Sequence, residues 1–498
     1  MCLLATASSD PTFVTYAFLV LAILLALAFE FVNGFHDTAN AVATVIYTNT
    51  LKATPAVVWS GLWNLLGVLF SSGLVAFGIV ALLPVELVVN IGSASGFAMV
   101  FSLLISAILW NLGTWYFGFP ASSSHTLIGS IIGVGLASSL MGPAHSISEG
   151  VNWAKAQDVG LGLLISPIVG FCASALLLLL CKALVKAPAL YCAPAGNAPP
   201  PLWIRSILML TCTGVSFAHG SNDGQKGMGL IVLILVGILP GSYALKMSAD
   251  QPAVSNVAVS AKALGSDFEK SAGGIHLNEQ ESDAALTNYI KSSGKLSPKV
   301  FAAMADKCEA LSQRLGAAKD LHGIPANVCA TVRTDLYLIS KTITKLQKAG
   351  ILTDPAVVAE AAKLKKSGEV LTNFIPAWVK YAVALALGLG TMIGYKRIVV
   401  TVGEKIGKQH MTYTQGGTAE LIAMSTILGA DHFGLPVSTT HVLTSGVAGT
   451  MCANNSGLQI TTLRNIVLAW ILTLPVCIFL GALLFAFGLN IIAILGMN

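Results

Sequence analysis

Residues 118–127 read Gly-Phe-Pro-Ala-Ser-Ser-Ser-His-Thr-Leu, and residues 434–443 repeat the pattern as Gly-Leu-Pro-Val-Ser-Thr-Thr-His-Val-Leu. Five of the ten positions are identical, and two more only exchange serine for threonine. Internal repetition of this kind indicates how a chain is assembled. The two stretches therefore predict two homologous halves, each with its own copy of this motif.

A second pair of motifs supports the same division. Residues 34–40 read Gly-Phe-His-Asp-Thr-Ala-Asn, and residues 220–226 read Gly-Ser-Asn-Asp-Gly-Gln-Lys. Asp37 precedes Pro120 by 83 residues, whereas Asp223 precedes Pro436 by 213 residues. An insert of about 130 residues in the second half explains the difference, because the order of the motifs is unchanged.

Composition places both halves in a membrane. The 498 residues are 55% hydrophobic and 10% charged, whereas soluble domains carry about 25% charged residues. Residues 246–380 hold 17 of the 28 Lys and Arg and 13 of the 23 Asp and Glu. We predict an all-α polytopic membrane protein with about ten to twelve transmembrane helices in two inverted repeats. The predicted parts are a first repeat (1–200), the start of the second (201–245), a soluble helical insert (246–378) and the remainder of the second repeat (379–498).

Charge placement predicts the orientation. Basic residues cluster at Lys182, Lys186 and Arg205 and again between Lys396 and Lys408, and short basic loops face the cytoplasm. We expect cytoplasmic basic loops, periplasmic termini and a cytoplasmic insert in a bacterial inner membrane. The basic residues are too dispersed for a nucleic-acid surface. The nine cysteines show no C-x-x-C spacing, so no metal cage or disulfide framework is indicated.

The repeated Ser/Thr motifs are typical of re-entrant hairpins in which Pro starts a short helix. A helix N-terminus binds an oxyanion without needing arginine, because its N–H groups are unpaired and its dipole is positive. Hydroxyls that bond only their own helix are the plainer reading, but duplication at matching positions favours a binding role. The predicted substrate-binding residues are Ser122, Ser123, Ser124, Ser438, Thr439 and Thr440.

The two Asp motifs each resemble a break in an apolar helix. Asp37 and Asn40 are three residues apart and share a helix face, and Asn222 and Asp223 offer the matching oxygens from the other half. A carboxylate inside a transmembrane segment is a functional candidate by default. Since carboxylates beside an anion site require an accompanying cation or proton, these four residues predict the coupling site.

Further titratable residues lie near these motifs. For His125, His441, Glu30 and Glu420, a proton-relay or gating role and a purely structural role remain equally open. Asp431 and His432 are expected at a membrane boundary. No fixed metal site and no permanently bound cofactor is predicted.

At the four motifs the sequence resembles the inorganic phosphate transporter (Pit) family. The insert and the sequence of residues 222–227, Asn-Asp-Gly-Gln-Lys-Gly, resemble the bacterial low-affinity branch of that family. The resemblance covers both membrane halves, about 360 residues. It implies inverted repeats, a homodimer, phosphate held by the hairpin hydroxyls and coupling cations at the Asp motifs. For the bacterial branch it implies proton symport of phosphate, as a neutral complex with a divalent metal.

Two residues depart from the family pattern. His36 stands where the signature has Asn, and Lys226 stands where the first half has Asn40. An imidazole or ammonium replaces a neutral oxygen ligand of sodium poorly, so we expect proton coupling in which His36 and Lys226 tune Asp37 and Asp223. The alternatives are sodium-coupled phosphate or sulfate symport and, less favoured, an anion channel, since acidic residues line the predicted site. An enzyme is not expected, because no third group orients Ser and His.

Overall fold

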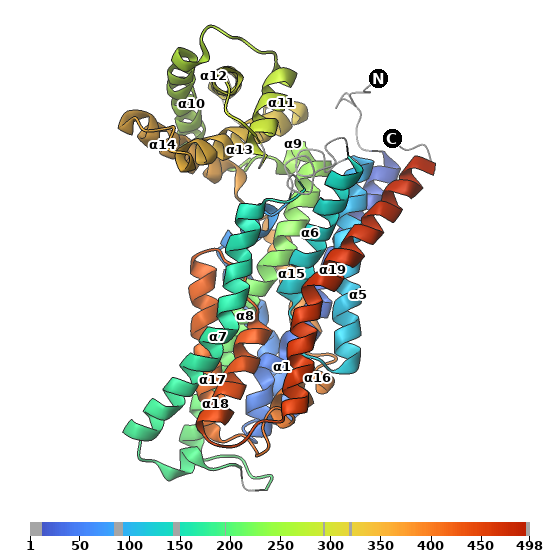
Figure 1. The fold of residues 1–498 in the computed structure, drawn as a ribbon, viewed down its shortest axis with the longest axis vertical. Coiled ribbons are helices and arrows are strands. Elements are labelled where there is room, and N and C mark those ends of the chain that lie inside the picture. The colour runs from blue at the N-terminus through green and yellow to red at the C-terminus, as the bar shows by residue number, and fades with distance from the viewer. Residues whose placement is uncertain are drawn as a thin grey trace.

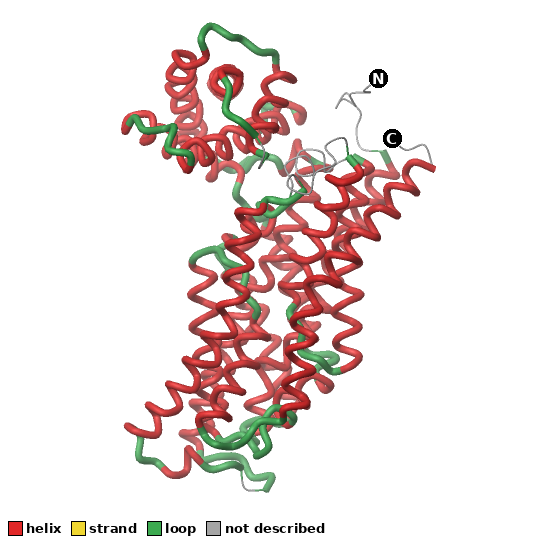
Figure 2. The backbone as a smooth tube through the Cα atoms, viewed as in Figure 1, coloured by secondary structure: helices red, strands yellow, loops and turns green. Residues whose placement is uncertain are grey.

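The computed structural model describes residues 12–83, 93–142, 150–194, 196–291, 294–317 and 321–494, apart from the side chains of residues 38–40. An elongated bundle of long helices carries a smaller helical unit at one end (Figure 1). The secondary structure of these residues is helical, with one antiparallel bridge between Gly407 and Leu458 and no strand (Figure 2). The observed class is therefore the predicted one, all-α.

The first half consists of apolar helices joined by short connections. It contains α1 (Phe13–Tyr47), α2 (Ala53–Phe70), α3 (Leu74–Val80), α5 (Ala94–Phe117), α6 (Ser123–Met141), α7 (Trp153–Leu184) and the 3-10 helix η1 (Pro188–Tyr191). Several begin with a side-chain cap: Thr12 caps α1, Ser93 caps α5 and Asn152 caps α7. These oxygens accept from N–H groups that the helix leaves unpaired.

The second half repeats this order around the insert. It contains α8 (Leu202–Ile238), α9 (Pro240–Tyr243), α15 (Ala377–Thr391), α16 (Lys396–Glu404), α17 (Tyr413–His432), α18 (Thr439–Ala453) and α19 (Ile460–Ile494). The insert contains α10 (Gln251–Ala272), α11 (Glu279–Ile290), α12 (Pro298–Gly316), α13 (Ala326–Lys348) and α14 (Pro355–Thr372). One apolar cluster made only of residues between Ala244 and Leu371 fills the insert, so it has its own core.

In the described part of the chain, seven helices are long and apolar enough to cross a membrane: α1, α2, α5, α6, α7, α8 and α19. The count rises to eight if α14 and α15, bent by 68° at their junction, are one span. We do not count that pair, because α14 packs on α10 of the insert. The shorter or more polar helices α15, α17 and α18 lie in the same bundle.

The two halves pack on each other reciprocally. Helix α1 lies against α15 of the second half, and α8 lies against α2 of the first half. A Cβ on Gly34 would lie 2.3 Å from the carbonyl oxygen of Leu387, and one on Gly220 would lie 2.1 Å from that of Asn64. Because only glycine permits such backbone contact, the glycines of the two Asp motifs have equivalent packing roles. This supports two related halves, and their inverted orientation stays a prediction.

The Asp motifs do not break their helices. Helices α1 and α8 run without interruption through Asp37 and Asp223, so the expectation of helix breaks there was wrong. Gly34 and Gly220 serve close helix packing, and neither has a positive φ.

The breaks lie in the Ser/Thr motifs instead. Gly118 (φ 72°) follows α5 and Gly434 (φ 64°) follows α17, and a left-handed residue of this kind ends a helix. After each break the chain turns back, so that α5–α6 and α17–α18 form hairpins. The α5–α6 hairpin comes from the end that carries the insert and the α17–α18 hairpin from the opposite end (Figure 1).

The insert shares its end of the bundle with the start of α1 and the end of α19 (Figure 1). The prediction of termini and insert on opposite sides of the membrane was therefore wrong. The reason is that α8 runs the length of the bundle and delivers the chain to the end from which α1 starts.

Candidate functional site

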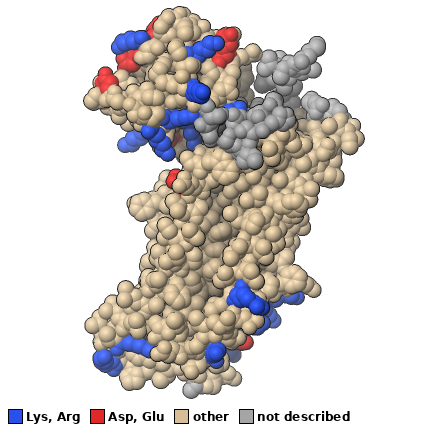
Figure 3. Space-filling model, in the orientation of Figure 1, with Lys and Arg blue, Asp and Glu red and all other residues tan. Residues whose placement is uncertain are grey.

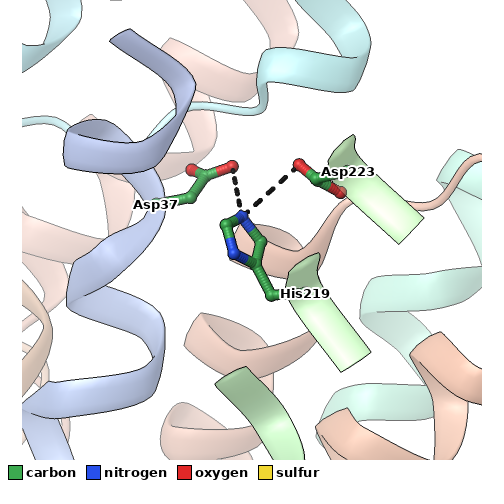
Figure 4. A group of neighbouring side chains, drawn as sticks. All are labelled: Asp37, His219 and Asp223. Carbon is green, nitrogen blue, oxygen red and sulfur yellow. Dashed lines mark ion pairs between the residues drawn. The ribbon is translucent and has the colours of Figure 1, made fainter. Parts of the chain in front are cut away.

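The centre of the bundle holds two carboxylates bridged by a histidine. Asp37 of α1 and Asp223 of α8 face each other, with His219 of α8 between them (Figure 4). His219 Nε2 lies 3.8 Å from Asp37 Oδ2 and 3.6 Å from Asp223 Oδ2. All three side chains are buried. Burial of two carboxylates is costly unless they are paired, so the nitrogen between them stabilises the arrangement.

Each carboxylate has a further nitrogen neighbour. Lys226 Nζ lies 2.7 Å from Asp223 Oδ2, and the Lys226 side chain is fully buried. His36 Nδ1 lies 3.2 Å from Asp37 Oδ1, and its Nε2 lies 3.1 Å from Thr114 Oγ1. The two departures from the family signature therefore both contact the carboxylates of the Asp motifs.

Both hairpin tips bring hydroxyls to Asp37. Ser123 Oγ lies 2.8 Å from Asp37 Oδ2, 2.6 Å from Asn33 Oδ1 and 3.4 Å from Asp223 Oδ2. Thr440 Oγ1 donates to Asp37 Oδ1 at 2.6 Å. Because α6 and α18 begin at these tips, two positive helix ends converge on the same carboxylate.

The other four predicted hydroxyls have distinct contacts. Ser122 accepts from His125 N and Ser438 accepts from His441 N, so both are N-caps. Ser124 Oγ donates to the carbonyl oxygen of Val437 at 2.8 Å and joins the two tips. Thr439 Oγ1 is buried and has no hydrogen-bond partner among the described residues. The hydroxyls of Ser122, Ser124 and Ser438 thus stabilise the tips, whereas the Thr439 hydroxyl is left to donate a hydrogen bond to a ligand.

Of the two asparagines predicted beside the carboxylates, the structure describes the side-chain contacts of Asn222. Asn222 Nδ2 donates to the carbonyl oxygen of Leu435 at 3.2 Å, which ties α8 to the α17–α18 hairpin. Its Oδ1 is buried without a partner among the described residues. Asn40 lies in α1, and its side chain falls outside the described residues.

The two glutamates join helices at different places. Glu30 Oε1 accepts from Gly227 N at 2.6 Å and its Oε2 accepts from Asn33 Nδ2 at 3.2 Å, next to the Lys226–Asp223 pair. Glu420 accepts from Thr44 and Thr211 and thereby joins α17 to α1 and α8. Glu30 therefore adjoins the central cluster, whereas Glu420 belongs to a separate polar contact.

The matched histidines of the two hairpins meet each other. The ring centroids of His125 and His441 are 4.6 Å apart, and His441 stacks on Trp470 at 4.0 Å. Trp470 Nε1 donates to the carbonyl oxygen of Pro120 at 2.9 Å. This stack therefore lies at the junction of the two tips.

Three residues of the site escaped the sequence reasoning. His219 and Asn33 occupy the same position, directly before Gly220 and Gly34, and the alignment of the two motifs one residue further would have found them. Asp431 was expected at a membrane boundary, and that was wrong. It is buried and accepts from Ser221 Oγ (2.7 Å) and Gln225 Nε2 (2.5 Å). The hairpin carries it against α8, where the polar partners Ser221 and Gln225 accommodate it.

Comparison with known proteins assigns the arrangement to a family. Residues 33–481 match the family model described as "Phosphate transporter family". The chain is 40% identical over 488 residues to the "Low-affinity inorganic phosphate transporter PitA" of Escherichia coli K12, covering 95% of this chain and 97% of that protein. It is 39% identical to PitB of the same organism, with the same coverage, and 26% identical to a "Probable low-affinity inorganic phosphate transporter" of Bacillus subtilis over 95% and 97% of the two chains.

One solved structure shares the fold. It is described as "The sodium-dependent phosphate transporter", with a TM-score of 0.52, 19% identity and coverage of 96% of this chain and 100% of that one. Transport by such proteins is not an enzymatic function. The chain belongs to the phosphate transporter family, with the Pit transporters of Escherichia coli among its relatives.

Proposed function

We propose that this protein imports inorganic phosphate by proton symport across the bacterial inner membrane. The observation that carries the proposal is that nitrogen groups surround both central carboxylates: Lys226 and His219 at Asp223, and His36 and His219 at Asp37. Sodium is bound by oxygen ligands, whereas imidazole and ammonium nitrogens are the neighbours of both carboxylates here. Asp37 and Asp223 act as the proton carriers.

The hairpin tips form the phosphate site in this proposal. Ser123, Thr439 and Thr440 supply hydroxyls, and the N-termini of α6 and α18 supply a positive dipole. Asp37 within reach of Ser123 and Thr440 is an acceptor, so an oxyanion beside it must carry a proton or a metal. Phosphate retains a proton at neutral pH and sulfate does not, and a buried polar group rejects a ligand that leaves it unpaired. The arrangement therefore favours phosphate over sulfate.

A divalent metal accompanies phosphate as part of the cargo. Asp37, His219 and Asp223 each offer one ligand atom, and these atoms lie within 4.8 Å of one another. Carboxylate oxygens with one imidazole are a donor set that divalent metals accept. A metal bound to phosphate lowers the charge of the cargo, which reduces the cost of moving it through an apolar bundle.

The orientation follows from the short loops. Lys182 and Lys186 stand at the end of α7 and just after it, Arg205 at the start of α8 and Lys396 at the start of α16. These segments lie toward the end of the bundle opposite the insert (Figure 1), where Lys and Arg side chains gather (Figure 3). By the positive-inside rule that end faces the cytoplasm, so the insert and both termini face the periplasm. We further propose a homodimer, as the family resemblance implies.

The test is radiolabelled phosphate uptake by the purified protein in liposomes, with proton and sodium gradients imposed separately and with magnesium present or absent. We expect accumulation under an inward proton gradient, no response to sodium and stimulation by magnesium. Excess sulfate should not compete. Accumulation that follows the sodium gradient and ignores the pH gradient would contradict proton coupling.

A further inference from the structure

A cavity of about 580 Å³ lies where the insert meets the membrane bundle. Residues of α3, the start of α7 and the end of α8 form its membrane-side wall, and residues of α13 and α14 form its insert-side wall. Its α8 residues, from Val232 onward, follow Asp223 by at least nine positions. The cavity is therefore distinct from the central site, and its volume is that of a site for a small organic molecule.

The cavity is strongly basic. Lys155, Arg333, Lys341 and Lys365 line it, and Glu369 is the one acidic residue among the described lining residues. No ion pair joins any of the four cations to a carboxylate in the described part of the chain. Lys and Arg side chains gather on the underside of the insert, where it faces the membrane helices (Figure 3).

The insert-side cations are held close together at an energetic cost. Burial, together with the positive charges of Lys365, Lys155 and Lys348, lowers the pKa of Lys341. Burial lowers the pKa of Arg333 to about 10, although its Nη1 donates to the carbonyl oxygens of Ala244 (2.8 Å) and Thr372 (3.0 Å). An anion in the cavity would relieve this repulsion.

The opposite wall is apolar and is formed by helices of the membrane bundle. It includes Phe77, Val80, Val232 and Val236. Trp153, at the start of α7, is 39% exposed, and exposed tryptophans mark the headgroup level of a bilayer. The apolar surface of α7 begins two turns further on with exposed leucines. A ligand with a charged head and apolar chains fits these two walls together.

We propose that this cavity binds the phosphate headgroup of an anionic phospholipid, with Lys155, Lys341 and Lys365 around the phosphate. The acyl chains leave along the apolar wall toward α7. Basic pockets at the headgroup level of transmembrane helices bind anionic lipids by this chemistry. The bound lipid joins the insert to α3 and α8.

One hydrogen bond connects α3, which lines this cavity, to the part of α8 that carries the transport site. Val75 N of α3 donates to Gln225 Oε1 of α8 at 2.9 Å, and Gln225 lies between Asp223 and Lys226 in the chain. Since α3 also supplies Phe77 and Val80 to the cavity wall, lipid binding constrains the helix that carries the coupling residues. We therefore expect the lipid to change the uptake rate.

The test is native mass spectrometry of the delipidated full-length protein with phosphatidylglycerol or phosphatidylcholine. Removal of two lysines near an anionic headgroup costs about fivefold in affinity for each, so Lys341→Gln with Lys365→Gln should weaken phosphatidylglycerol binding about 25-fold. The matched control is Lys262→Gln with Lys299→Gln, which removes two exposed charges from the same insert and should change nothing. Lys155→Gln, outside the insert, should weaken binding about fivefold even if the double variant fails to fold.

Any of three results would overturn the proposal. One is an unchanged affinity for phosphatidylglycerol in the Lys155→Gln variant and in a folded double variant. Another is displacement of the lipid by millimolar inorganic phosphate, which would identify a free anion as the ligand. Equal binding of phosphatidylcholine would likewise remove the role of the lysines.

Discussion

In the proposed mechanism Lys226 occupies the place of a coupling cation, and its replacement by asparagine tests this directly. The Lys226 ammonium is fully buried and lies 2.7 Å from Asp223 Oδ2. Removal of one partner from a buried ion pair costs about 3–5 kcal/mol, because the other charge is left uncompensated. In Lys226→Asn the side chain becomes the one found at Asn40 in the first half, so the site gains an oxygen ligand and loses a positive charge.

The expected result is a change of driving ion. At about 1.4 kcal/mol per factor of ten, the lost pairing corresponds to at least about a 100-fold penalty on the ionised site. Protonation of Asp223 or a bound sodium ion must offset it. Phosphate uptake into liposomes should therefore fall steeply under a proton gradient and acquire a dependence on sodium.

The matched control is Lys186→Asn, the same change at an exposed residue after α7. It should leave the uptake rate and the ion dependence as they are. The reasoning would be refuted if Lys226→Asn folded, remained in the membrane and kept its full response to the proton gradient, because the ammonium would then have no part in coupling.

Three further predictions address the carboxylate, the packing and the insert. Asp37→Asn should abolish accumulation, because an amide cannot take up and release the coupling proton, whereas Asp158→Asn, at an exposed position of α7, should not; equal accumulation in both would contradict the assignment. Gly220→Ala places a Cβ 2.1 Å from the carbonyl oxygen of Asn64 and should cost about 1–3 kcal/mol, measured as a lower melting temperature. In the matched control Gly160→Ala the new Cβ meets no atom within 4 Å, so the melting temperature should not fall. Burial of Lys307 in the insert opposes its charge, but Asp335 and the other nearby carboxylates raise the Lys307 pKa above the ordinary 10.5. The charged Lys307 therefore contributes its full stabilisation below pH 10.5. This stabilisation is lost as the pH rises through the folded-state pKa. The melting temperature of the insert should fall on that alkaline limb, and a Lys307→Gln variant should show a smaller fall.

The membrane helices and the hairpins of this protein can be predicted from its sequence, because local polarity and internal repetition encode them. The apolar runs define transmembrane helices, since a bilayer leaves backbone groups no partner outside the helix. The hairpins were predictable as well, because Gly118, Pro120 and the hydroxyls recur at 434–440. Asp37, Asp223, Ser123 and Thr440 were therefore recognisable as one group before their contacts were seen.

Other features depend on contacts between distant segments, which periodicity does not encode. Gly34 and Gly220 looked like breaks in their helices, but the backbones of α15 and α2 fill the space above them. His219 reaches Asp37 only because α8 packs beside α1. Asp431 is central only because a hairpin carries it inward.

The sequence by itself determined the all-α membrane class, and it predicted the two halves, the insert and the residue types of the site. Only the tertiary structure decided that nitrogen groups surround both carboxylates and that the insert shares an end of the bundle with the start of α1 and the end of α19. The physical reason is that the polarity of a segment is local, whereas the partner of a buried charge is supplied by whichever helix packs against it.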